Sequence, residues 1–227
     1  MWAVYKKELK TYFLSPIGYI AIGIFMLMYS IFFYLTTILL GSVDMGNLYY
    51  ATARYGLLLI VPLLTMRMFS EERKNGTEQL LLTSPRSVTS IVLGKFLAAA
   101  SVIVITLILS IIYSIIISFF GNINVPTIIA TMFGFLLVAM AAISIGTLAS
   151  SITENQIIAA IITIVALVAP WFLVDISKIF SSIDLIDKFM KFPYGLISIS
   201  DVISLISITV MCLLITIVLI KRRKAVK

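Results

Sequence analysis

The sequence contains no histidine and only one cysteine. Without histidine, the chain cannot form serine-histidine or cysteine-histidine nucleophile pairs, an HExxH zinc site or a histidine-ligated haem site. Cys212 lies in an apolar run and has no second cysteine to pair with. The acidic residues are scattered without metal-ligand spacing. A G-x-x-x-x-G-K-[ST] loop is also absent, because Gly94-Lys95 lacks the upstream glycine that would help to cradle phosphates. We therefore expect no catalytic, cofactor-binding or metal site in this chain.

Charge is scarce as well. Charged residues make up 12% of the chain and hydrophobic residues 61%, with a mean hydropathy of +1.15. Soluble domains are only about half apolar, and a chain of this size could not bury so much apolar surface by itself. The net charge of +7 comes from short basic clusters between apolar runs. These clusters are typical of membrane topology signals and do not indicate a nucleic-acid partner. Composition therefore predicts an integral membrane protein.

The apolar residues form six stretches, most of them near the roughly 20 residues that a membrane-spanning helix requires. The stretches are Gly18–Leu40, Tyr55–Phe69, Ile91–Phe119, Pro126–Ile152, Ile157–Val174 and Val202–Ile220. The second is short, but it can be extended back through Leu48–Arg54, and Pro62 is expected to kink it. We predict an all-α integral membrane fold with six transmembrane helices, organised as a single domain over residues 1–227.

The basic residues near the span ends predict the orientation of the chain. One side would hold 13 of them: Lys6, Lys7, Lys10, Arg67, Arg73, Lys74, Arg86, Lys95, Lys221, Arg222, Arg223, Lys224 and Lys227. The other side would hold Arg54, Lys178, Lys188 and Lys191. Cytoplasmic loops carry the excess of lysine and arginine, so both termini and the loop after the second span are predicted to be cytoplasmic.

Two further segments are amphipathic. In residues 1–15, Trp2, Tyr5, Leu9, Tyr12 and Phe13 recur at helical spacing opposite Lys6, Lys7 and Lys10. This pattern predicts a helix along the inner leaflet that ends at Ser15-Pro16. Residues 175–195 repeat apolar positions at three and four and are interleaved with charges. They predict one or two short helices at the outer interface, for which a membrane-resting loop and a lid over an exit path both remain open.

Residues 70–85, between the second and third spans, carry the densest charge in the chain. Gly76 can redirect the helix that continues from the second span, Thr77 can cap a new helix, and Glu78 suits its positive dipole end. Leu80, Leu81 and Leu82 then supply an apolar surface. Ser84-Pro85 is typical of a cap followed by proline in the first helical turn, so the third span is predicted to start near there. The pattern favours a short cytoplasmic helix available to a partner, although a solvated charge run would have the same composition.

Two motifs together resemble the permeases of ABC type-2 exporters. The first runs over Met66-Arg67-Met68-Phe69-Ser70-Glu71-Glu72-Arg73, Gly76-Thr77-Glu78-Gln79-Leu80-Leu81-Leu82-Thr83-Ser84-Pro85 and Val92-Leu93-Gly94-Lys95. The second, Tyr5-Lys6-Lys7-Glu8-Leu9 with Ser15-Pro16-Ile17-Gly18-Tyr19-Ile20, is similar to the gliding-motility-associated subgroup. The six spans and the interfacial helix before the last span extend the likeness over the whole chain.

The resemblance implies that residues 1–15 are a connecting helix and that residues 70–85 contain a coupling helix for a separate ATPase subunit. The residues implied in coupling are Glu71, Glu72, Arg73, Gly76, Thr77, Glu78, Leu80 and Leu81. It further implies an ATPase dimer that binds ATP and magnesium, a second permease chain (a second copy or a related permease), and a location in the cell membrane. The substrate is not readable from the sequence.

Two other functions are alternatives to a permease subunit. An ion-coupled secondary transporter would place ionisable groups near the bilayer midplane, but no charge occurs between Lys95 and Glu154. A structural or assembly protein of the membrane stays open, and it predicts no ATPase partner. Small residues on the fourth span, including Gly134 and Gly146, predict close helix packing, either within the chain or against a second one.

Overall fold

The computed structural model describes residues 1–41, 45–79, 86–121, 124–173 and 183–226. These residues are almost entirely helical and contain no strand. Among them, six helical segments are long and apolar enough to cross a membrane: Pro16–Ile38, Gly46–Lys74, Val88–Ser118, Val125–Ile152, Gln156–Leu173 and Ile199–Arg223. The predicted all-α fold with six spans is confirmed, and the second span has the backward extension that its short apolar core required.

The N-terminal helix α1 (Trp2–Leu14) ends where the sequence predicted. Ser15 adopts an extended conformation, with φ −90° and ψ 155°, and α2 (Pro16–Phe33) begins with the proline. Proline disfavours helical geometry in the preceding residue but fits the first turn of a new helix. Span 1 continues from α2 into the π-helical segment η1 (Tyr34–Ile38).

The second span is a series of helical segments. It contains α3 (Gly46–Ala51), the π-helical segment η2 (Thr52–Gly56) and α4 (Leu57–Thr65), which includes Pro62. A turn over residues 66–69 then separates α4 from α5 (Ser70–Lys74). The predicted redirection at Gly76 is present as a positive φ of 70°, but the helix already breaks ahead of α5.

The remaining spans are α7 (Val88–Ser118), α8 (Val125–Ile152), α9 (Gln156–Leu173) and α12 (Ile199–Val226). The third span was predicted to start near Ser84-Pro85, and α7 begins shortly after it, at Val88. Its cap is Ser87, whose side chain accepts a hydrogen bond from the Ser90 amide at 3.3 Å. Residues 80–85 lie outside the described part of the chain.

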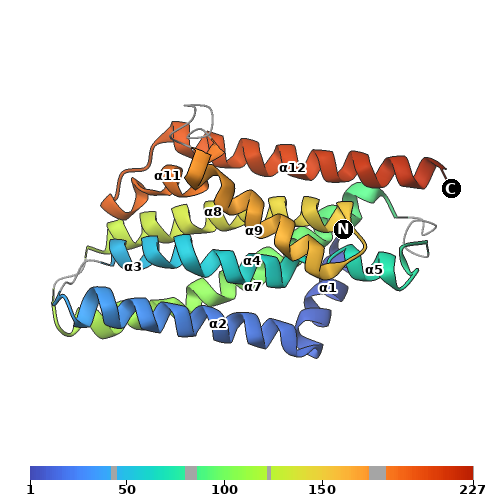
Figure 1. Ribbon diagram of the computed structural model, residues 1–227. Helices are drawn as coiled ribbons and strands as arrows, with labels where there is room; N and C mark the ends of the chain where they lie inside the picture. Colours follow the sequence, from blue (N-terminus) through green and yellow to red (C-terminus); the bar gives the residue numbers. More distant parts are fainter. Residues whose placement is uncertain (42–44, 80–85, 122–123, 174–182, 227) are drawn as a thin grey trace.

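Helix α8 occupies the centre of the bundle and packs against α4, α7, α9 and α12 (Figure 1). The second and fourth spans are 61% and 56% buried within the chain, whereas the first and fifth are only 22% and 17% buried. The small residues of α8 are used for packing inside the chain: a Cβ at Gly146 would lie 2.2 Å from Thr65 Oγ1, and one at Gly134 would lie 2.4 Å from the Phe192 ring. The intrachain interpretation of these positions is confirmed.

The segment before the last span is partly inserted into the bundle. Helix α11 (Leu185–Phe189) and the 3-10 turn η3 (Phe192–Tyr194) bury Leu185, Ile186, Phe189 and Phe192 in the apolar core. The Phe189 ring meets Phe135 of α8 edge-on, with 6.2 Å between ring centres. Residues 183–195 of the segment predicted to lie at the outer interface therefore pack partly into the core at this end of the bundle. Residues 174–182 lie outside the described chain.

Helices α1 and α5 and the C-terminal part of α12 share one end of the bundle, which we call the basic end, and α3 and α11 share the opposite end (Figure 1). The predicted partition of the basic residues follows this division: Lys6, Arg73 and Arg223 lie at the basic end, and Lys188 and Lys191 at the other. The assignment of the basic end to the cytoplasm stays a prediction.

Candidate functional site

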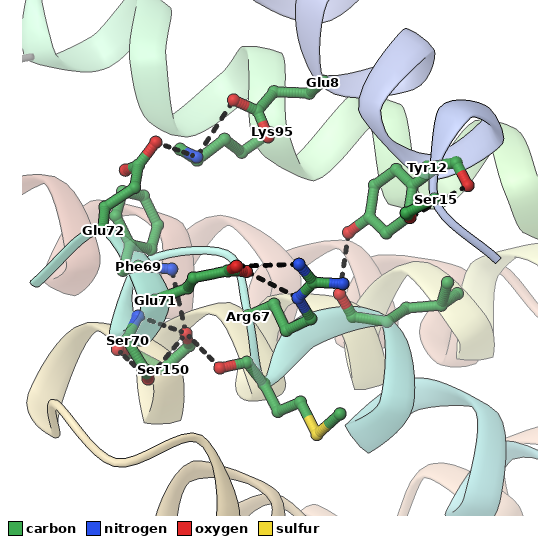
Figure 2. Close-up of polar contacts among 12 residues, drawn as sticks. Glu8, Tyr12, Ser15, Arg67, Phe69, Ser70, Glu71, Glu72, Lys95 and Ser150 are labelled. Atoms are coloured by element: carbon green, nitrogen blue, oxygen red, sulfur yellow. Dashed lines mark hydrogen bonds and ion pairs between the residues drawn. The ribbon is translucent and has the colours of Figure 1, made fainter. Parts of the chain in front are cut away.

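A network of charged and hydroxyl side chains joins α1, α5, α7 and α8 at the basic end (Figure 2). At its centre lies Lys95 of α7, whose side chain is 2% exposed. Its Nζ donates to Glu8 Oε1 of α1 at 3.1 Å and to Glu72 Oε1 of α5 at 2.8 Å. It also lies 5.4 Å from the centre of the Phe69 ring. A buried ammonium is tolerated only when it is paired, and here one cation ties two separate segments to the third span.

Gly94, the residue before Lys95, allows α1 to pack closely against α7. A Cβ at Gly94 would lie 2.9 Å from Val4 Cγ1 and 3.1 Å from the Tyr5 amide nitrogen. Any larger residue would push α1 away from α7. The contact is completed by Tyr5, whose hydroxyl lies 2.9 Å from Ser101 Oγ. The Gly94-Lys95 pair thus provides the space and the charge that dock α1.

The turn over residues 66–69 leaves backbone groups that α1 satisfies. The Met68 amide bonds to the Thr65 carbonyl instead of the Leu64 carbonyl, and the Tyr12 hydroxyl donates to Leu64 O at 2.7 Å. Burial, with the Glu8 carboxylate adding to it, raises the pKa of Tyr12, which keeps the phenol a neutral donor. In the same region, Arg67 and Glu71 form an ion pair with two hydrogen bonds. Arg67 Nε donates to Glu71 Oε2 at 2.5 Å, and Arg67 Nη2 donates to Glu71 Oε1 at 2.8 Å.

Ser150 of α8 stabilises the start of α5. Its Oγ accepts from the Phe69 amide at 3.1 Å and from the Ser70 amide at 3.3 Å, and it also contacts Met66 O. Phe69 occupies the cap position of α5 but has no side-chain acceptor. The first amides of a helix need an acceptor from outside, and here α8 supplies it.

Replacing Ser150 with alanine is expected to destabilise the protein by about 1–3 kcal/mol, because the amides of Phe69 and Ser70 would stay buried without an acceptor. Hydrogen exchange at these two amides should accelerate, and the melting temperature of the purified chain should fall. Ser151→Ala is the matched control, since the Ser151 hydroxyl donates only to Leu148 O of its own helix. Equal effects of the two changes would contradict the capping role.

Two arginines close the C-terminal end of α8. Arg73 donates to Ile152 O at 3.0 Å and to Glu154 at 2.7 Å, and Arg223 of α12 donates to Ser151 O at 2.6 Å. Basic side chains are favourable at this end of a helix dipole. Glu78 lies between them, 3.8 Å from Arg73 and 3.5 Å from Arg223. The loop after the second span is thereby tied to the last span.

The residues predicted for partner contact divide into three groups. Glu71, Glu72, Arg73 and Glu78 form ion pairs inside the chain. Gly76 and Thr77 are exposed, together with their neighbours Lys74 and Asn75. Leu80 and Leu81 lie outside the described residues. The charged members therefore brace the loop, and residues 74–77, which we call the exposed tip, project from it.

Sequence reasoning missed the roles of Glu8 and Ser150 and treated Lys95 as a topology residue. A signal for Lys95 was present: it lies about two turns from the start of the apolar helix α7, where an ionisable side chain needs a partner. No comparable signal marks Ser150, because serine is common on the packed faces of membrane helices. Among the described residues, no group of three or more acidic or cysteine side chains could hold a metal ion.

Comparison with known proteins adds an independent observation. Residues 44–221, well over half of the chain, match the family model described as "ABC-2 family transporter protein". A search of the curated proteins found no match. The matched region includes the second span, the loop with the exposed tip, and the later spans, so it covers the α5, α7 and α8 members of the network but not helix α1.

Proposed function

The chain belongs to the ABC-2 family of transporter proteins, and from this premise we propose that it is the permease subunit of an ATP-driven exporter, coupled to a separate ATPase. Its six apolar helices and family identify a multi-pass membrane protein. In the proposed complex, an ATPase dimer binds ATP and magnesium and contacts the basic end. The gliding-motility-associated subgroup is the nearest fit to the Tyr5–Leu9 and Ser15–Ile20 motifs.

The observation that carries the coupling proposal is the bracing of the exposed tip. The exposed tip, residues 74–77, begins with the last residue of α5, and α5 is held to α7 through Lys95 and to α8 through Ser150. A push on a flexible loop would be absorbed locally, whereas a push on a braced helix moves the spans to which it is fixed. Closure of the ATPase dimer would thus shift the bundle as a rigid-body switch that opens a path outward.

A second permease chain would complete the path. The first and fifth spans have mostly exposed apolar faces, with Leu27, Ile31, Ile161 and Val165 among their exposed side chains. Lipid covers such faces in a lone chain, and another permease can cover one of them in a pair. We propose a second copy or a related permease as that partner. The positive-inside distribution supports a cell-membrane location with both termini in the cytoplasm.

The exposed tip provides the test. We expect the combined change Lys74→Glu and Thr77→Asp to reduce ATPase co-purification with the co-expressed chain by about tenfold or more, because two new negative charges would face the partner. Lys74 forms no described ion pair, so the fold should be kept. Glu72 is unsuitable as a test position, because its loss would also leave Lys95 without one of its partners.

Lys188→Glu, at the opposite end, is the control and should leave co-purification unchanged. ATP hydrolysis by the recovered complex is measured in parallel, since the tip variant should also lose any stimulation by the permease. If no ATPase associates with the unaltered chain in any nucleotide state, the exporter proposal fails. A structural membrane protein would then be the better interpretation.

A further inference from the structure

Arg54 is a cation inside the second span whose charge has no acidic partner among the described residues. It lies in η2, about two turns from the start of the span at Gly46, and is only partly exposed. Its Nη1 donates to the Tyr50 hydroxyl at 3.3 Å, and its Nε is buried without a hydrogen-bond partner. By contrast, Arg67, Arg73, Lys95 and Arg223 all have carboxylate partners.

Aromatic rings provide the rest of its surroundings. The guanidinium carbon lies 4.9 Å from the centre of the Trp171 ring of α9 and 5.7 Å from that of Tyr55. Such contacts orient a guanidinium and partly compensate its charge, but they accept none of its hydrogen bonds. A guanidinium stays charged and has five donors in a planar fork. A charge of this kind within a membrane span calls for an anion.

The surroundings also limit where an anion can lie. Beside Arg54 is a cavity of about 20 Å³, whose lining includes Leu58, Leu167, Trp171 and Leu185, and it has room for about one water molecule. A phosphate or carboxylate is too large for this cavity, so it would lie against the exposed part of the Arg54 side chain. Tryptophan and tyrosine favour the level of the lipid head groups, which suits this depth near the opposite end of the bundle. Toward the middle of the membrane, the half-buried Leu58 and Leu167 continue the surface.

We propose that Arg54, Tyr50 and Trp171 bind the anionic phosphate or carboxylate head of an amphiphile whose chain lies against Leu58 and Leu167. The two Nη groups of the planar fork form paired hydrogen bonds with two oxygens of the head, which a lysine cannot reproduce. A bilayer phospholipid and a transported amphiphile both offer this chemistry. Binding itself does not depend on the proposed function, but identification of the ligand as cargo rests on it.

Trp171 makes the site observable. The chain has two tryptophans, so Trp2→Phe leaves Trp171 as the only one. In this background, the full chain in neutral detergent is titrated with phosphatidylglycerol that carries brominated acyl chains, and quenching of Trp171 is measured. We expect saturable quenching with an affinity about tenfold higher than for brominated phosphatidylcholine, because the net-anionic head pairs with the guanidinium.

Three variants test the residue. Arg54→Gln should lose the preference for phosphatidylglycerol, Arg54→Lys should keep only part of it, and Lys188→Gln, which removes a charge from the same end, should change nothing. An unchanged preference in Arg54→Gln would overturn the proposal. So would an equal fluorescence response to inorganic phosphate alone, since that would indicate a free-anion site without a bound chain.

The same measurement with the ATPase present separates lipid from cargo. Release of the brominated lipid from Trp171 on addition of ATP and magnesium, lost in the Lys74→Glu/Thr77→Asp variant, would identify the site as part of the transport path. Retention of the lipid under those conditions would support a resident phospholipid at the same site. Because the first titration uses the chain without the ATPase, failure of the exporter proposal leaves the binding result interpretable.

Discussion

Replacing Lys95 with methionine is expected to lower the free energy of unfolding by about 3–5 kcal/mol, since removal of one member of a buried ion group leaves the others uncompensated. Methionine is an unbranched side chain one heavy atom shorter than lysine, and it removes the ammonium that contacts Glu8 and Glu72, which are 13% and 16% exposed. These two largely buried carboxylates would then lose the cation that both of them contact. The melting temperature of the purified chain should fall, and α1 should become accessible to protease as it detaches from α7.

Two controls define the cause of this loss. Lys7 also lies near Glu8, at 4.0 Å, but its side chain is 66% exposed, so Lys7→Met should change stability by less than about 1 kcal/mol. The triple change Lys95→Met, Glu8→Gln and Glu72→Gln removes the whole charged group and should recover most of the stability. If Lys95→Met alone melts like the unaltered chain, the ion group does not hold α1 and α5 to the bundle.

The six spans were predictable because hydropathy is a local property. A run of about 20 apolar residues must be helical in lipid whatever surrounds it, since each backbone group has to be satisfied within the segment. The proline that ends α1 and the glycine at position 76 are equally local, because each acts through its own backbone geometry. These features were therefore read correctly from the sequence, apart from the exact cap of the third span.

The polar network was not predictable, because its members are far apart in the chain. Lys95 and Glu8 are 87 positions apart, and Ser70 and Ser150 are 80 apart. A charge-rich loop shows which residue types are present but not which of them face inward. For Glu72, the sequence predicted a role in partner contact, which stays a prediction, but it did not show the contact with Lys95. Arg54 was counted among the outer basic residues for the same reason, while its aromatic neighbour Trp171 comes from the fifth span.

The close packing of α8 against α4 predicts the second large loss of stability. Gly146→Ala is expected to destabilise the protein by about 3 kcal/mol, at the upper end of the usual range for overpacking. The new Cβ would lie 2.2 Å from Thr65 Oγ1, 2.8 Å from Thr65 Cβ and 2.9 Å from Thr65 Cγ2. Thr65 ends α4 immediately before the turn that Ser150 stabilises, so it has little freedom to move away. Thermal unfolding of the purified chain measures the loss.

Gly23→Ala is the matched control, because a Cβ at that position of α2 would meet nothing within 4 Å. It should be neutral or slightly stabilising, since alanine is the better helix former. Both substitutions reduce backbone flexibility, but only Gly146→Ala creates a steric clash, so the difference between their effects measures the clash. If both glycine substitutions have the same effect, close packing of α8 on α4 is not the reason for the loss.

Thr65→Ala provides the compensating change for a double-mutant cycle. Alone, it removes a hydroxyl that donates only to Val61 O of its own helix, at 2.8 Å, so its effect should be small. Combined with Gly146→Ala, it removes two of the three clashing atoms and should restore more than half of the lost stability. Because helices in a membrane associate through close packing, this recovery should also return the exposed tip to its braced position. ATPase co-purification should therefore fall in Gly146→Ala and recover in the double variant, whereas recovery of stability without recovery of co-purification would show that the α4–α8 contact does not position the tip.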